Sequence, residues 1–371
     1  MKDYLKEYGI TPYINAHDTI TLYGGSRMPE EAKEAMDQIS RVFVDMDQLQ
    51  QTLGRHIASV THNEGAYIAN SAAGAIKLCT AVCLARGEES FYKNLPDTKG
   101  LPADEIVVIH AQHNCYDKAI EAAGARLRLV GDADEILPFD LKAAVSERCA
   151  AVYYFPASIY RRGSMPLSQV VRIAHEQGVP VVVDAAAQLP PVENLWRFTG
   201  EGADLVIFSG GKTLMGPQSS GLILGKLALI EDCLRFGSPA HGICRDSKVS
   251  REGMIGLAAA IDRYLALDQR EERKRMSDRV DRLIRAMSES GLYQPYRKEH
   301  GSVGQDYPRA FARISPPYTP GDIVSRMKER GIFIGEDRMD CAIYISPLNL
   351  TDEECITVGL CLKEIGKNIT L

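Results

Sequence analysis

A lysine and an aspartate each stand at the end of an apolar run that is typical of a buried strand. Lys212 follows the run 205–208 and a turn of small residues at 209–211, and Asp184 ends the run 181–183. A lysine amine forms a Schiff base with an aldehyde, and an aspartate keeps a pyridine nitrogen protonated. The pair therefore predicts pyridoxal 5'-phosphate (PLP) as the cofactor, whereas Lys212 taken alone would equally suit a surface lysine in a strand-to-loop turn.

A stretch of small residues at 70–75, Asn-Ser-Ala-Ala-Gly-Ala, follows another predicted strand and opens a predicted helix. Backbone N–H groups at the start of a helix, with small hydroxyl donors beside them, bind phosphate groups. We therefore expect this stretch to hold the 5'-phosphate of the cofactor. Tight packing of the helix against the sheet would favour the same small residues.

Two further side chains are expected at the same edge of the sheet. His113 follows the predicted strand 106–110 and precedes a helix, so its imidazole could stack on the pyridine ring or cap that helix. Gln188, four residues after Asp184, could donate a hydrogen bond to the ring hydroxyl or cap the following turn. The sequence leaves both alternatives open.

The composition excludes several classes of protein. The 371 residues carry 43 basic and 49 acidic side chains, a net charge of −6, so no strong positive field recruits nucleic acid or an anionic membrane. The nine cysteines are scattered, with no cluster at the spacing of a zinc site, and fit reduced thiols in the cytoplasm. No uninterrupted apolar stretch reaches membrane-spanning length. We expect a cytoplasmic protein with no metal and with neither nucleic acid nor membrane as partner.

Short apolar runs alternate with helical periodicity from about residue 54 to 225. Strands are predicted at 65–69, 106–110, 126–130, 150–155, 179–184, 205–209 and 220–225, and helices at 72–86, 116–124, 141–147 and 168–177. Near-continuous valine and isoleucine runs separated by helices are typical of an α/β fold with a mostly parallel sheet. Ligands bind beyond the carboxyl ends of such strands, where Asp184 and Lys212 fall.

The region 251–290 has the pattern of one long helix that joins two domains. The remainder predicts a small α+β domain, with strands at 310–314, 332–335 and 342–346 and capped helices at 319–330 and 351–365. We therefore expect a large PLP-binding domain at 15–250, a smaller C-terminal α+β domain at 251–371 and an N-terminal segment at 1–14.

Over nearly its whole length the chain resembles the fold-type I PLP-dependent enzymes. The aspartate, lysine and glycine signature of their aminotransferase class V and selenocysteine-synthase-like group is matched by segments 183–188, 208–212 and 216–221. Within that group the chain is most similar to D-glucosaminate-6-phosphate ammonia-lyases, through segments 14–16, 24–29, 184–191 and 202–212. The resemblance implies the fold-type I PLP-dependent transferase fold and a homo-oligomer, at least a dimer with shared active sites.

The resemblance also assigns roles to single residues. Lys212 would form the Schiff base and move the Cα proton, Asp184 would pair with the pyridine nitrogen, and His113 would stack on the ring. The phosphate would be held by Ala72, Ala73, Gly74 and Ser209. Lys248 stands where cysteine desulfurases reach the phosphate of the neighbouring chain, so it would contact phosphate across a dimer interface or be an ordinary surface lysine.

Two features depart from the patterns of related enzymes. Tyr344 stands in the predicted strand 342–346 where many class V relatives carry the arginine that grips the substrate carboxylate. The remaining candidates for that contact are Arg161, Arg162, Arg313 and Arg338, each of which would otherwise be solvated. Bacterial selenocysteine synthases carry an additional N-terminal domain that grips tRNA, whereas this chain enters the catalytic region by Asn15, so we expect no tRNA substrate.

The function implied by the resemblance is that of a PLP-dependent ammonia-lyase. It would remove water and ammonia from a 2-amino-3-hydroxy acid, such as D-glucosaminate 6-phosphate, to give a 2-keto-3-deoxy acid. A cysteine desulfurase or selenocysteine lyase is the nearest alternative, with Cys341 as the candidate nucleophile. Selenium transfer on seryl-tRNA is a third candidate function, and a non-catalytic PLP-binding regulatory protein is a fourth.

Overall fold

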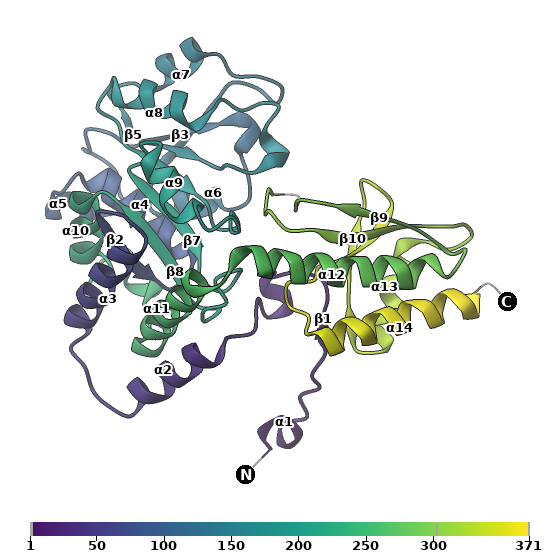
Figure 1. The fold of residues 1–371 in the computed structure, drawn as a ribbon. Helices are drawn as coiled ribbons and strands as arrows, with labels where there is room; N and C mark the ends of the chain where they lie inside the picture. The colour runs from purple at the N-terminus through teal and green to yellow at the C-terminus, as the bar shows by residue number, and fades with distance from the viewer. Residues whose placement is uncertain (1–2, 302, 370–371) are drawn as a thin grey trace. The chain divides into compact units, whose positions relative to one another are not determined.

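The computed structural model describes residues 3–301 and 303–369 (Figure 1). They form two compact units, one of residues 26–266 with 303–305 and one of residues 3–25, 267–301 and 306–369. These are called the large unit and the small unit below. The division of the chain into domains at 15–250 and 251–371 stays a prediction.

The large unit is built on a sheet that has seven strands in the part of the chain described. Their order is β2-β8-β7-β6-β5-β3-β4, with bounds Gly65–Ala69, Gly221–Gly225, Leu205–Ser209, Val181–Asp184, Cys149–Tyr154, Glu105–Ile109 and Arg126–Val130. β8 is antiparallel to both of its neighbours, and the other neighbouring strands pair in parallel. The mostly parallel α/β sheet expected from the sequence is confirmed.

Most helices of the large unit pack along this sheet, whereas α2 packs against α11, as Figure 1 shows. The helices are α2 (Glu30–Ser40), α3 (Met46–Val60), α4 (Ala72–Ala85), α5 (Glu89–Asn94), α6 (Asp117–Ala122), α7 (Pro138–Ala144), α8 (Leu167–His175), α9 (Asn194–Gly200), α10 (Leu227–Phe236) and α11 (Arg251–Ala266), with short 3-10 turns η2 (His110–Gln112), η3 (Ser158–Tyr160) and η4 (Arg245–Ser247). α4 is apolar on nearly all sides and shares one buried cluster with side chains of β3, β5 and β7. A helix of this kind must be enclosed by the fold, so its start is held firmly against the sheet.

The small unit combines an antiparallel sheet with helices. In the residues described, the sheet has the strand order β12-β13-β10-β9 (Gly335–Asp337, Ala342–Ile345, Arg309–Ile314 and Tyr293–Lys298), and β1 (Ile14–Asn15) pairs in parallel with β11 (Ile332–Phe333). The helices are α1 (Tyr4–Glu7), α12 (Gln269–Ser288), α13 (Pro320–Glu329) and α14 (Asp352–Ile369). Apolar side chains of α12, β10, β13 and α14 form its core. Within residues 3–301 and 303–369, no helix is both long and apolar enough to cross a membrane.

The single helix expected over 251–290 is wrong, because the chain breaks into α11 and α12 at Leu267 and Asp268. The Asp268 carboxylate accepts the backbone N–H groups of Arg270 at 2.9 Å and Glu271 at 3.2 Å. An aspartate that satisfies these N–H groups is a helix N-cap, so a new helix begins there. The break was hidden in the sequence because an aspartate also suits the solvated face of a charged helix.

A buried ion pair joins the chain just after β1 to the sheet of the small unit. Arg309, at the start of β10, has a side chain only 4% exposed, and its Nη2 donates to Oδ2 of Asp18 at 3.0 Å and to the hydroxyl of Tyr307 at 2.6 Å. The Tyr307 hydroxyl in turn donates to Oδ1 of Asp18 at 3.3 Å. Burial raises the pKa of Tyr307, so its phenol stays a neutral donor.

We expect Asp18→Asn to lower the free energy of unfolding by about 3–5 kcal/mol, because it leaves the Arg309 guanidinium buried without a counter-charge. Urea unfolding followed by circular dichroism measures the change. The matched control is Asp37→Asn, which removes the exposed pair with Arg41 (2.8 Å) and should cost less than about 1 kcal/mol. Equal effects of the two substitutions would contradict the assignment of Asp18 as a buried counter-ion.

Candidate active site

One edge of the large sheet collects the carboxyl ends of β2, β7, β6, β5, β3 and β4. The reversed strand β8 begins at this edge, between the ends of β2 and β7. Asp184 ends β6 and Ser209 ends β7, with Lys212 three residues further on. Because neighbouring strands lie about 4.8 Å apart, these residues come from adjacent positions. The structure thus brings the predicted aspartate, serine and lysine to the same edge.

Asp184 is a partly buried carboxylate in the middle of this edge. Its Oδ1 accepts the backbone N–H of Ala186 at 2.9 Å. Burial raises the pKa of the Asp184 carboxyl, and the charge of Asp117 adds to the rise, whereas the Ala186 N–H and the charge of Lys212 oppose it. Lys212 is therefore close enough to act on Asp184, and a further cation placed against Asp184 would offset the cost of its burial.

The turn that carries Lys212 is tightly enclosed. A Cβ on Gly210 would lie 2.0 Å from a neighbouring side-chain oxygen, and a Cβ on Gly211 would lie 2.4 Å from another. The Gly211 carbonyl accepts the hydroxyl of Ser26 at 3.1 Å, and the Lys212 carbonyl accepts the N–H of Met215 at 2.9 Å. Neighbouring side chains lie so close to the two glycines that no larger residue fits, and the two hydrogen bonds hold the backbone of Lys212 in place.

The start of α4 has the features of an anion cradle. Ser71 is the N-cap, and its Oγ accepts the N–H of Gly74 at 2.9 Å. The N–H groups of Ala72 and Ala73 lie in the first turn, where a helix offers them no acceptor of its own. A Cβ on Gly221, the first residue of β8, would lie 2.5 Å from the backbone of Ser71, so this glycine lets β8 and the helix start meet. The role of Ser71 was missed in the sequence, although a serine before an apolar helix is a capping signal.

His113 lies in the loop between β3 and α6, and its side chain is 49% exposed. Its Nδ1 is hydrogen-bonded to Oδ2 of Asp117, a carboxylate in the first turn of α6 that is 1% exposed. The same Oδ2 accepts the N–H of Asn114 at 3.2 Å. Asp117 was missed in the sequence, and its four-residue spacing from His113 was the only signal that could have found it.

Two other residues predicted to contact the cofactor, Gln188 and Lys248, lie in the large unit. Gln188 is buried, and its Nε2 donates to the carbonyl of Val303 at 2.7 Å. Lys248 is exposed at the end of η4, close in sequence to Asp246, which pairs with Lys77 of α4 at 2.8 Å. A contact of Gln188 with a ring hydroxyl and a contact of Lys248 with phosphate across an interface therefore stay predictions.

The candidate carboxylate-binding arginines fall in both units. In the large unit, Arg161 is exposed after η3 and lines a cavity of about 410 Å³, and its neighbour Arg162 forms an exposed ion pair. In the small unit, the Arg313 guanidinium lies 5.3 Å from the ring centre of Tyr296, and Arg338 is exposed in the turn between β12 and β13. All four stay predictions as substrate ligands.

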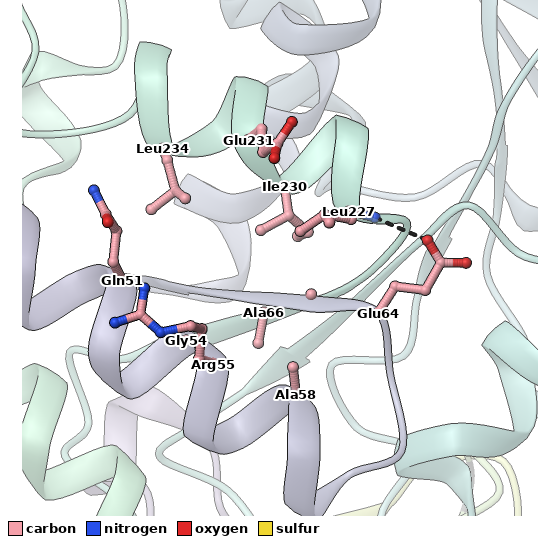
Figure 2. Close-up of a pocket in the computed structure, with 11 residues that line it drawn as sticks. Gln51, Gly54, Arg55, Ala58, Glu64, Ala66, Leu227, Ile230, Glu231 and Leu234 are labelled. Atoms are coloured by element: carbon pink, nitrogen blue, oxygen red, sulfur yellow. Dashed lines mark hydrogen bonds between the residues drawn. The ribbon is translucent and has the colours of Figure 1, made fainter.

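A hollow of about 400 Å³ lies at the opposite edge of the large sheet, where β2 begins (Figure 2). Leu227, Ile230 and Leu234 of α10 face it on one side and Ala58 of α3 on the other, as Figure 2 shows. Glu64 at its rim accepts the N–H of Leu227 at 3.1 Å. Its lining within the described residues includes none of the predicted site residues, so it is separate from the site.

The residues at the carboxyl edge fit PLP. Lys212 supplies an amine for the aldehyde, and Asp184 is a carboxylate whose burial favours a cationic partner such as a protonated pyridine nitrogen. The first turn of α4 supplies N–H groups for a phosphate, and His113 supplies a half-exposed ring. This donor set, carried by one edge of the sheet, is complementary to the aldehyde, the ring nitrogen and the phosphate of the cofactor.

The raised pKa of Asp184 has a consequence for the cofactor-free protein. Since the folded state disfavours the ionised carboxyl, stability falls as the pH rises from the unfolded-state pKa through the raised folded-state pKa. We expect Asp184→Asn to be at least as stable as the wild type at pH 7, with its advantage shrinking on acidification. Thermal unfolding across a pH series measures this.

The control for that series is Asp132→Asn. The backbone N–H groups of Glu135 and Asp134 lower the pKa of Asp132, so its ionised form favours folding and the substitution should lose stability at neutral pH. A loss of stability in Asp184→Asn at pH 7 would instead mean that the attraction of Lys212 outweighs burial.

Comparison with known proteins shows the family to which the chain is related. The profile of SelA, L-seryl-tRNA selenium transferase, matches residues 21–286. The 5'-C-glycyluridine monooxygenase-decarboxylase of a Streptomyces species is 33% identical over 283 residues, which cover 74% of this chain and 68% of the relative. The D-glucosaminate-6-phosphate ammonia lyase of Salmonella typhimurium is 29% identical over 264 residues, which cover 70% of this chain and 69% of the relative.

The solved structures agree on the fold. A structure of D-glucosaminate-6-phosphate ammonia-lyase has a TM-score of 0.86 at 23% identity, with all of both chains covered. The fold-type I fold expected from the sequence is therefore confirmed. The family match and these relatives also show that the chain is an enzyme, which removes the regulatory-protein alternative. With more than half of its length matched, the chain belongs to the SelA, L-seryl-tRNA selenium transferase, family.

Proposed function

We propose that this enzyme is a PLP-dependent carbon–nitrogen lyase that acts on a 2-amino-3-hydroxy acid, with D-glucosaminate 6-phosphate as the leading candidate substrate. The observation that carries the proposal is the pair of opposite charges at adjacent strand ends, Asp184 and Lys212, beside an anion cradle at the start of α4. The similarity to the Salmonella ammonia lyase supports the reaction class.

PLP would be held by residues of the large unit. Lys212 would bind its aldehyde carbon, Asp184 its ring nitrogen, and His113 would lie against the ring. Ala72 and Ala73 would donate backbone N–H groups to the phosphate, and Ser209 and Gly74 would complete its binding site. Gly74 has no Cβ, which would otherwise clash with the side chain of Asn70. When bound, PLP supplies an electron sink that makes the Cα proton of an amino acid removable.

Lys212 is the residue that moves the proton at Cα. The enclosed backbone turn would hold its Nζ in place, and that amine would take the Cα proton of the substrate. Asp184 keeps the charge of the ring nitrogen in place throughout. Loss of the C3 hydroxyl as water, and then of the amine as ammonia, leaves a 2-keto-3-deoxy acid.

A homodimer with shared active sites in the cytoplasm is part of the proposal. Lys248 is the candidate residue that reaches the phosphate of the neighbouring chain, and its exposure at the end of η4 supports that role. The cysteines are free thiols in the described residues, which supports a reducing compartment. The large PLP-binding domain would span 15–250, and the small domain would begin at 251.

The second candidate function is an oxygen-dependent decarboxylation of an amino acid. It is favoured by the 33% identity to the monooxygenase-decarboxylase of Streptomyces. Both candidate reactions break a bond at Cα and need the same pair of Asp184 and Lys212. They differ in the bond broken and in the requirement for oxygen, so product analysis separates them.

The lyase proposal predicts that the PLP-loaded enzyme releases ammonia and a 2-keto acid from D-glucosaminate 6-phosphate. Lys212→Ala should lower kcat by at least about 1,000-fold, because no other amine can take the Cα proton, and should abolish the visible absorbance of bound PLP. Lys274→Ala, which removes an exposed lysine of α12, is the matched control and should keep both. Full turnover by Lys212→Ala would rule out the mechanism.

Oxygen dependence tests the second candidate. The lyase should release the same amount of ammonia in the absence of oxygen and no carbon dioxide from its substrate. An oxygen-dependent release of carbon dioxide from 5'-C-glycyluridine, with no ammonia released from the 3-hydroxy acid, would replace the lyase proposal by the decarboxylase.

A further inference from the structure

The site edge contains a histidine–aspartate pair that ring stacking does not explain. Nδ1 of His113 is committed to Oδ2 of Asp117, whose side chain is 1% exposed. The other oxygen of Asp117, Oδ1, is buried and has no hydrogen-bond partner among the residues described. A ring that served only for stacking would need no buried carboxylate, and burying one without a cation is unfavourable.

The loop that carries His113 is anchored independently of this pair. Gln112 is fully buried, its Oε1 accepts the backbone N–H of Phe155 at 2.7 Å, and its Nε2 donates to the hydroxyl of Ser164 at 2.7 Å. Phe155 directly follows β5, the neighbour of the strand that ends in Asp184. The position of the His113 backbone is therefore set by Gln112, which leaves the carboxylate of Asp117 to orient the ring.

Titratable groups of several neighbouring segments surround the pair. They include Cys115, Tyr116, Lys118, Tyr160, Asp184 and Lys212. Burial raises the pKa of both tyrosines, so their phenols are neutral. Asp117 and Asp184 lie near each other at this edge, and the His113 ring is the side chain that is hydrogen-bonded to the carboxylate of Asp117.

We propose that Asp117 is a positioning residue that accepts the Nδ1–H of His113, and that the ring, when it carries a proton on both nitrogens, donates its Nε2 proton to the departing C3 hydroxyl of the substrate. The inference rests on the proposed lyase function and supplies the general acid of that reaction. His113 is then a catalytic residue, and Asp117 acts through it. The hydrogen bond to Asp117 keeps a proton on Nδ1, so Nε2 is the ring nitrogen that exchanges its proton with the substrate.

The step balances without any further reactant. Nζ of Lys212 takes the Cα proton, and the electron pair of that C–H bond becomes the second bond between Cα and C3. The C3–O bond breaks with its electron pair on oxygen, which takes the Nε2 proton of His113 and leaves as water. The ring is 49% exposed, so it regains a proton from solvent.

The first test uses the cofactor-free protein. Nitrogen-15 NMR of the histidine rings, recorded at a pH where the His113 ring is neutral, should find its one proton on Nδ1 in the wild type, and Asp117→Asn should shift the population toward the other tautomer. A wild-type His113 with no proton on Nδ1 would overturn the proposal. This readout does not depend on the reaction that the enzyme catalyses.

The second test compares leaving groups. Chloride leaves without a proton, so a 2-amino-3-chloro acid needs no general acid, whereas the 3-hydroxy acid does. We expect His113→Gln and Asp117→Asn to slow loss of the hydroxyl by about 100-fold or more while slowing loss of chloride less than about 5-fold. Equal slowing of both eliminations would show a merely structural role and would overturn the proposal.

The matched control is Asp262→Asn, which breaks the exposed pair between Asp262 and His56, 2.7 Å apart on α11 and α3. It should leave both elimination rates and the His113 tautomer unchanged. A wild-type enzyme that eliminates neither group would refute the lyase function itself, and the NMR result would still decide whether Asp117 sets the tautomer of His113.

Discussion

The site depends on a carboxylate that has to be buried at the edge of a sheet. A buried charge is stable only when an opposite charge faces it, and Asp184 ends a strand that is flanked on both sides by β5 and β7. The reversed strand β8 makes the solution possible. Because β8 starts at the edge where β7 ends, the chain between them stays at that edge and carries Lys212 beside Asp184. The same start of β8, at Gly221, meets the start of α4, so the anion cradle is placed by the same constraint.

Those parts of the site that follow from strand ends could be predicted from the sequence. Asp184 ends one apolar run and Lys212 follows another after a turn of three small residues, and the length of such runs is enough to locate the edge. β9 was missed because it contains Pro295, which argues against a strand. The proline is tolerated there because β9 is at the edge of its sheet. The break at Asp268 was missed because an aspartate is common both as a helix N-cap and on the solvent-exposed face of a continuous helix.

Partners that meet only in the folded chain could not be predicted. Asp18 and Arg309 are 291 residues apart in the sequence, and nothing local distinguishes Arg309 from the solvated arginines that were considered as substrate ligands. The Arg309 guanidinium is buried against Asp18 and Tyr307, so its role is to stabilise the small unit. Asp117 is a different case: its partner is only four residues away, but a six-residue helix has too little periodicity to show which of its faces is buried.

The extent of the family match separates what relatives share from what distinguishes them. The match to SelA stops at residue 286, within α12, so it covers the whole edge with Asp184 and Lys212 and leaves out β10, β13 and α14 of the small unit. Relatives named for a lyase, a monooxygenase-decarboxylase and a selenium transferase match 70%, 74% and 66% of this chain, so the names differ while much of the sequence is matched in each. A shared fold therefore does not by itself fix the reaction. Groups beside this edge would then select the reaction, and the pair of Asp117 with the half-exposed ring of His113 is the one that we propose for this chain, because a general acid favours a leaving group that needs a proton.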